Sequence, residues 1–173
     1  CELNRHEIEY IYTMVDDFRR LVIDYTNTFI FLCNHKTQQA SHCLEAVFAN
    51  KVLKQHQYIY SGAMIVNLLT HFELGNYQLL ESLLLNTYRM MYKRKLLFAS
   101  EKIIFKYLKK YLRNHNNQQI VQSFRSLKQE LQAVQCEKFE QNFLPNFDLV
   151  VWIESKIKEK PMASIVQTKG LSL

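Results

Sequence analysis

The chain has 173 residues, of which only 3 are glycine and 2 are proline, where average usage would give roughly 20 of the two together. A sandwich or barrel needs turn residues every few positions, so this composition excludes those all-β classes. Hydrophobic residues at 48% and a formal net charge of +6 are typical of a folded protein with a sizeable core, not of a disordered chain.

Apolar residues recur at steps of three and four from the start of the chain. This spacing predicts one long helix over residues 8–32, a polar break at 34–39 and a second helix over 40–54. The same pattern predicts helices over 58–74 and 77–92, separated by Gly75 and Asn76. A glycine just after a helix relieves the left-handed backbone of its C-terminal cap.

The second half of the chain continues the helical pattern. A fifth helix, with Ser100 and Glu101 in its opening turn, is predicted to end at Arg113, and a sixth covers 118–136. Residues 137–144 are ambiguous and either extend that helix or form a short one. We expect Asn146 to cap a last helix that ends near residue 158 and is anchored by Trp152. The tail, 161–173, is weakly patterned, and we expect it to be loosely ordered.

The helix breaks recur at a nearly fixed interval. They fall near Asn34, Gly75 and His115, which are 41 and 40 residues apart. Fixed periods of this size are typical of stacked helix pairs. We therefore predict an all-α, right-handed α-solenoid of three antiparallel helix pairs with a C-terminal capping helix. The single helical-repeat domain covers 1–160, with hairpins at about 5–54, 58–95 and 98–136 and the capping helix at 146–159; residues 161–173 are the tail.

The segment Leu74-Gly75-Asn76-Tyr77-Gln78-Leu79-Leu80-Glu81 resembles the turn between the two helices of a tetratricopeptide repeat. In that turn a glycine, an acidic or amide residue and an aromatic residue precede the second helix. The resemblance covers about one hairpin and implies a tetratricopeptide-like fold. The repeat interval is longer than the usual 34 residues, and Leu80 stands where a small residue is expected.

A wider resemblance covers about the whole chain. The runs 72–82 (FELGNYQLLES) and 147–157 (FDLVVWIESKI), followed by Pro161, are similar to uncharacterised helical-repeat proteins of Bacteroidota. These are packing motifs, and that family has no assigned activity. The resemblance therefore implies a fold and a bacterial origin, but no reaction.

Two groups of residues are candidates for chemical sites. Cys33, His35, His42 and Cys43 are competent metal ligands around the first break. Their spacing matches no common zinc pattern, and adjacent helical residues diverge by about 100°, so whether they bind metal stays open. His71 and Glu73 could act as an acid–base pair only if both side chains turned inward. We predict that the chain is not an enzyme and that it binds no cofactor.

Positive charge is concentrated in residues 89–113, which hold 9 basic and 1 acidic side chains. The predicted fifth helix places one stripe of cations opposite its apolar stripe. This basic face is the candidate ligand-binding site: Lys102, Lys106, Lys109, Lys110 and Arg113. The simpler interpretation is that these basic side chains form a solvent-exposed helix face that binds no ligand.

The function predicted from these patterns is a protein-interaction scaffold that binds a peptide or partner domain in a helical-repeat groove. Self-association through an uncapped end is a further expectation. The alternative is binding of nucleic acid or an acidic ligand through residues 89–113. Four cysteines without CxxC spacing favour reduced thiols and a cytoplasmic location. No membrane partner is expected, and the chain, which does not begin with Met, is expected to be part of a longer protein.

Overall fold

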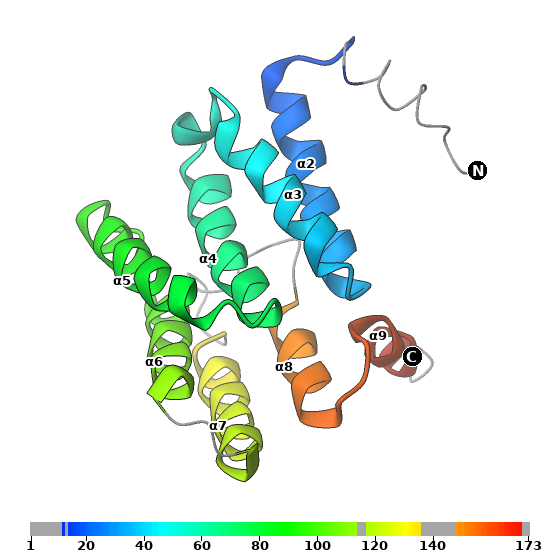
Figure 1. Cartoon of the computed structure of the whole chain (residues 1–173), viewed down its shortest axis with the longest axis vertical. Helices are drawn as coiled ribbons and strands as arrows, with labels where there is room; N and C mark the ends of the chain where they lie inside the picture. Colours follow the sequence, from blue (N-terminus) through cyan, green and yellow to red (C-terminus); the bar gives the residue numbers. More distant parts are fainter. Residues whose placement is uncertain (1–11, 13, 114–116, 136–147, 171–173) are drawn as a thin grey trace.

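The computed structural model describes residues 12, 14–113, 117–135 and 148–170. Throughout these residues the regular structure is helical, as the composition predicts (Figure 1). The elements, in chain order, are α2 (Asp17–Cys33), α3 (Thr37–Ala49), the 3₁₀ turn η1 (Leu53–Gln55), α4 (Gln57–Glu73), α5 (Tyr77–Lys93), α6 (Ala99–Arg113), α7 (Asn117–Gln135), α8 (Leu149–Lys158) and α9 (Met162–Gly170).

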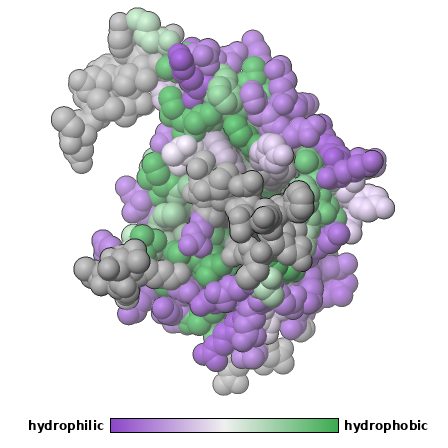
Figure 2. Space-filling view, turned by 180° about the vertical axis from the view of Figure 1, so that it is seen from behind, coloured by the Kyte–Doolittle hydropathy of each residue, from purple (hydrophilic) through white to green (hydrophobic). Residues whose placement is uncertain are grey.

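Each helix packs against the next one along the chain, from α2 on α3 through to α8 on α9 (Figure 1). The buried side chains form one continuous hydrophobic core that every α-helix enters. Leu21, Leu44, Leu69, Leu80 and Trp152 are each at most 2% exposed. Seen from the side opposite Figure 1, hydrophobic residues gather towards the middle of the molecule and hydrophilic ones line much of its edge (Figure 2).

Two of the predicted breaks share one backbone geometry. His35 and Gly75, 40 positions apart, have left-handed φ values of 56° and 70°. In each turn the following amide bonds back five residues, from Lys36 to the carbonyl of Phe31 at 2.9 Å and from Asn76 to that of His71 at 3.1 Å. This bond closes a Schellman cap, which satisfies carbonyls that the helix end would leave without partners. The third predicted break, at His115, lies outside the described residues.

Helix boundaries near the N-terminus differ from the prediction. The continuous helix over 8–32 is wrong at residue 16, where Asp16 has an extended backbone and its side chain accepts a hydrogen bond from the amide of Arg19 at 2.8 Å. A carboxylate in this position caps a new helix, so α2 begins at Asp17. The next helix ends at Ala49 instead of residue 54, because Asn50 turns extended and η1 follows.

The C-terminal end is more ordered than predicted. Asn146 lies outside the described residues, and the cap that the structure shows for α8 is Asp148, which accepts from the amide of Val151 at 3.0 Å. Residues 162–170, expected to be loosely ordered, instead form α9. Met162 and Ile165 are each 3% exposed and belong to the core. Two buried side chains one turn apart are enough to hold a short helix whose periodicity is weak.

Trp152 anchors α8, as predicted. Its ring makes edge contacts with Phe72 of α4, at 5.7 Å between centroids, and with Phe124 of α7, at 5.8 Å. Its indole N–H donates to Glu73 Oε1 at 2.7 Å, and Lys156 Nζ donates to Glu73 Oε2 at 2.6 Å. α8 is therefore held on the end of α4 by ring packing and by two bonds to one carboxylate.

Candidate functional site: the basic surface of α6 and its aromatic neighbour on α5

The cations predicted as a binding face lie on α6, and all five are exposed. The opposite side of the helix is buried through Ile104 and Leu108, which are 2% and 5% exposed. This burial follows from the spacing of the apolar residues, which places them on one side of the helix and the lysines on the other. The structure places five basic side chains at exposed positions of this helix, and their binding of a ligand stays a prediction: Lys102, Lys106, Lys109, Lys110 and Arg113.

One of these lysines is engaged within the protein. Lys106 Nζ lies 2.8 and 2.9 Å from the carboxylate oxygens of Glu130 on α7, and the Tyr107 hydroxyl donates to the same carboxylate at 2.7 Å. The hydrogen bond from Lys106, together with that from Tyr107, lowers the pKa of Glu130. Partial burial and the bond to Glu130 raise the pKa of Tyr107 to about 12. Lys106 therefore helps to join α6 to α7.

A row of exposed apolar side chains runs along the neighbouring helix α5. Leu85, Tyr88 and Tyr92 occupy positions i, i+3 and i+7 and are 51%, 41% and 69% exposed. The two tyrosine rings are nearly parallel, with centroids 6.5 Å apart. Tyr88 also meets the edge of Phe105 on α6 at 5.4 Å. The row therefore borders α6 directly.

Helical spacing places basic side chains of α6 close to the point where α5 packs on α6. Phe105 touches Tyr88, and Lys102 and Lys109 lie three residues before and four residues after Phe105, on the same side of the helix. Phe98, just before α6, is 45% exposed. We call this surface the α5–α6 face; its members are Leu85, Tyr88, Arg89, Tyr92, Lys93, Phe98, Lys102 and Lys109.

Sequence reasoning missed the apolar half of this face. Spacing alone does not separate tyrosines that pack in helix interfaces from tyrosines that line an exposed surface, and Tyr111 is of the first kind, at 4.6 Å between ring centroids from Phe72. Leu85, Tyr88 and Tyr92 form a second apolar stripe on α5, beside the buried stripe of Leu80 and Leu84. This second apolar stripe is visible in the sequence and is the signal from which an exposed apolar surface on α5 could be predicted.

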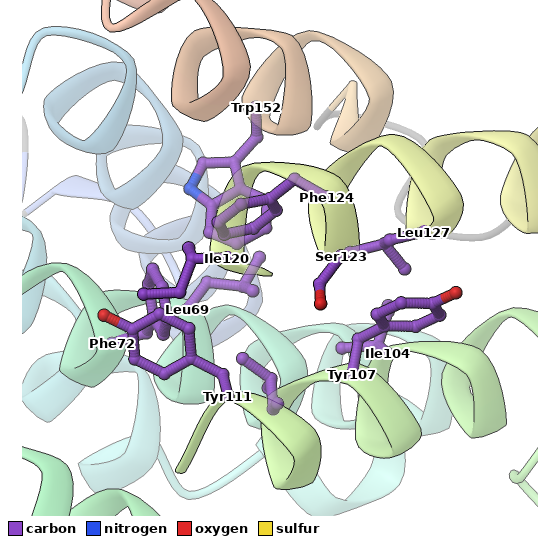
Figure 3. Close-up of a pocket in the computed structure, with 11 residues that line it drawn as sticks. Leu69, Phe72, Ile104, Tyr107, Tyr111, Ile120, Ser123, Phe124, Leu127 and Trp152 are labelled. Atoms are coloured by element: carbon purple, nitrogen blue, oxygen red, sulfur yellow. The ribbon is translucent and has the colours of Figure 1, made fainter. Parts of the chain in front are cut away.

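A small cavity lies between α4, α6, α7 and α8 (Figure 3). Figure 3 shows Trp152 and Phe124 together on one side of it and Tyr107 and Tyr111 of α6 on the other. Its volume is about 20 Å³ and its lining is almost wholly apolar. A space of this size holds about one water molecule, so this cavity is a packing feature of the core and has no room for a substrate.

The structure forms neither of the two candidate chemical sites. Glu73 bonds to Trp152 and Lys156, while Nδ1 of His71 lies 3.3 Å from the amide of Asn76, so the acid–base pair of His71 and Glu73 is not formed. Burial lowers the pKa of His71.

The cysteine–histidine group is also dispersed. His42 is exposed and lies 3.4 Å from Glu45, and burial raises the pKa of both Cys33 and Cys43. The part of the chain that the structure describes contains no group of three or more histidine, cysteine or acidic side chains placed to hold a metal ion.

Comparisons with protein-family models, curated proteins and solved structures found no match to this chain. Across the described residues, no helix has the length and apolar character needed to cross a bilayer.

Proposed function

We propose that this chain is a protein-interaction scaffold, in which a right-handed stack of antiparallel, tetratricopeptide-like helix pairs presents a surface to a peptide or partner domain. The observation that carries the proposal is the row of Leu85, Tyr88 and Tyr92, three large side chains exposed on one side of a helix whose other side is already in the core. Contiguous apolar surface of this kind marks a contact site in soluble proteins.

Two features of the fold support the proposal. Helices contact their neighbours in chain order, which is how a stack of repeats is built. The helix ends at His35, Gly75, Lys95 and Glu159 share one left-handed cap geometry, which gives the short turns between helices that a stack requires. A stack of helix pairs exposes long helical surfaces without catalytic loops, so binding is the work it is suited for.

Photo-crosslinking tests the proposal directly. Benzoylphenylalanine replaces Tyr92 in one version of the chain and Val166, a 53% exposed residue of α9, in a control version. Each is irradiated in nuclease-treated native lysate, and adducts are identified by mass spectrometry. We expect discrete protein adducts from position 92 that are absent from position 166. Equal adducts at both positions, or none at either, contradict the scaffold function.

Nucleic-acid binding is the second candidate, favoured by exposed lysines beside exposed aromatic rings, a combination that binds single strands. Titration of labelled oligo-dT across a salt series tests it. Nucleic-acid binding requires affinity to fall with a logarithmic salt slope of roughly −0.7 for each phosphate neutralised. It also requires the double substitution Lys102→Glu and Lys109→Glu to reduce both affinity and slope. No binding at low salt rules this candidate out.

A further inference from the structure

We propose that the α5–α6 face docks an acidic, amphipathic helix of a partner protein; this names the partner's chemistry and rests on the scaffold function proposed above. The first step is geometric. The row from Leu85 to Tyr92 covers eight residues of α5, and the seven rises between its ends amount to about 10 Å of helix. An apolar row of two turns on a helix surface fits the matching stripe of a second helix, which contacts it through residues three and four apart.

One ring of the aromatic row, that of Tyr88, already packs against α6 within the protein. Tyr88 packs edge-on against Phe105, with an interplanar angle of 89°, and its ring lies nearly parallel to that of Tyr92, at 10°. Side chains ordered in the free protein lose little conformational entropy on binding. Tyrosine is also enriched among the residues that dominate interface energies.

Charge decides the chemistry of the partner. Arg89 and Lys93 are exposed beside the apolar row on α5, and Lys102 and Lys109 are exposed on α6 within about one turn of Phe105, which contacts Tyr88. In residues 89–113 the one acidic side chain, Glu101, is 4% exposed and accepts from the amide of Phe98 at 3.0 Å. It therefore caps the start of α6 and lies inside the fold, not among the exposed side chains of the face.

Two other cations of the segment have partners inside the protein and are left out of the face. Lys106 binds Glu130, and the guanidinium of Arg94 lies 4.7 Å from the centre of the Tyr60 ring. The four cations of the face, which are Arg89, Lys93, Lys102 and Lys109, attract carboxylates. Glu81 is exposed one turn before Leu85, so an acidic side chain lies at the Leu85 end of the apolar row. The acidic residues of the partner are therefore expected opposite Arg89, Lys93, Lys102 and Lys109, and not beside Glu81.

A partner helix fits this surface better than a nucleic-acid strand. Leu85 and Phe98 are large apolar side chains without a polar atom, and both are substantially exposed. Bases and phosphates cover a leucine side chain poorly, whereas the leucine or phenylalanine of an amphipathic helix covers it fully. The combination of an apolar row with flanking cations therefore indicates a helix that is apolar on one side and acidic on the other.

Selection from a displayed library of random peptides of about 15 residues, enough for four helical turns, tests the proposal on the full chain. Selected sequences are expected to carry net negative charge and apolar residues at helical spacing. Their affinity is then measured against the variant Leu85→Gln/Tyr92→Gln and the variant Lys102→Glu/Lys109→Glu. We expect at least a tenfold loss of affinity in each.

Matched controls separate the face from general surface effects. Leu79→Gln changes a leucine of α5 that is 47% exposed but lies about a third of a turn away from Leu85. Lys51→Glu/Lys160→Glu produces the same change in net charge on exposed residues of other elements. Both controls are expected to keep the affinity of the wild type within about twofold, and circular dichroism establishes that every variant is folded.

Several results of the peptide selection would contradict the proposal. The acidic-helix proposal is overturned if no peptide is enriched or if the enriched peptides lack acidic residues. It is also overturned if the enriched peptides bind the face variants as tightly as they bind the wild type. Face-dependent binding of oligo-dT in place of peptides also overturns it, in favour of nucleic acid. Crosslinks from position 92 to a protein that lacks an acidic helix overturn this inference and leave the scaffold function standing.

Discussion

Glu73 at the end of α4 accepts a 2.7 Å hydrogen bond from the indole of Trp152 on α8, across 79 positions of sequence. Lys156 completes the arrangement by donating to the other carboxylate oxygen at 2.6 Å. A carboxylate that is mostly withdrawn from water needs such donors, because burying it without them is costly. This contact therefore ties the last part of the chain to its middle.

Substitution of Trp152 is expected to destabilise the protein in two distinguishable steps. Trp152→Phe keeps an apolar ring near Phe72 and Phe124 but removes the donor to Glu73, so we expect a loss of about 1–3 kcal/mol in the free energy of unfolding. Trp152→Ala also leaves a cavity, and we expect about 3–5 kcal/mol. Because Trp152 is the single tryptophan, urea unfolding is followed by far-ultraviolet circular dichroism.

The control for this series is Tyr58→Ala, which truncates an aromatic side chain that is 80% exposed. Surface substitutions of this kind change stability by about 0.5 kcal/mol or less. A Trp152→Ala variant as stable as Tyr58→Ala is incompatible with an anchoring role for the indole.

Glu130 is expected to titrate below its ordinary pKa, because it accepts hydrogen bonds from Lys106 and then from Tyr107. A carboxyl whose folded pKa is lowered contributes stability above its unfolded pKa, near 4.5. That contribution is lost as pH falls through the folded value. Because Glu130 and Lys106 are both substantially exposed, the contribution to stability is small.

The titration is best followed by NMR of the Glu130 side-chain carboxyl. Lys106→Ala is expected to raise the pKa of Glu130 towards its ordinary value, and Tyr107→Phe is expected to raise it by a smaller amount. Lys109→Ala serves as the control, since it removes a cation of α6 that is not among the groups that lower this pKa. An unchanged pKa in Lys106→Ala means that the ion pair does not form in solution.

The left-handed turns predict opposite effects for two substitutions. No atom lies within 4 Å of the place where a Cβ would be built on Gly75, so Gly75→Ala tests backbone conformation alone. At φ +70° we expect it to cost about 1 kcal/mol. His35→Gly, in the matching turn with φ 56°, relieves strain and is expected to raise stability by up to about 1 kcal/mol, offset in part by the entropy of glycine.

Thermal unfolding of the two turn variants beside the wild type measures this difference. A His35→Gly variant that is destabilised as much as Gly75→Ala shows that the two turns do not share a left-handed cap.

Helix α9 is expected to be part of the cooperative core. Ile165 is 3% exposed and its neighbour Val166 is 53% exposed, so the pair offers a matched comparison within one helix. Ile165→Ala is expected to cost about 2–4 kcal/mol, and Val166→Ala about 0.5 kcal/mol or less. Urea unfolding of both variants provides the measurement. Equal stability of the two variants is the result that argues against a docked α9.

The sequence by itself determined which residues are helical over most of the described chain. Scarcity of glycine and proline excluded sheets rich in turns, and apolar spacing located the helices and the exposed lysines of α6. These are local properties, because 3.6-residue periodicity and cap chemistry depend on near neighbours in sequence. Where a local signal competed with periodicity, as at Asp16, the cap decided the helix boundary.

Only the tertiary structure decided which apolar stripes are covered. Periodicity places Leu85, Tyr88 and Tyr92 on one side of α5, yet it does not say whether another helix packs there. In the same way, the bond from Trp152 to Glu73 and the engagement of Lys106 by Glu130 join residues far apart in sequence. The character of the α5–α6 face depends on which side chains remain exposed after such long-range packing, and spacing along one chain does not contain that information.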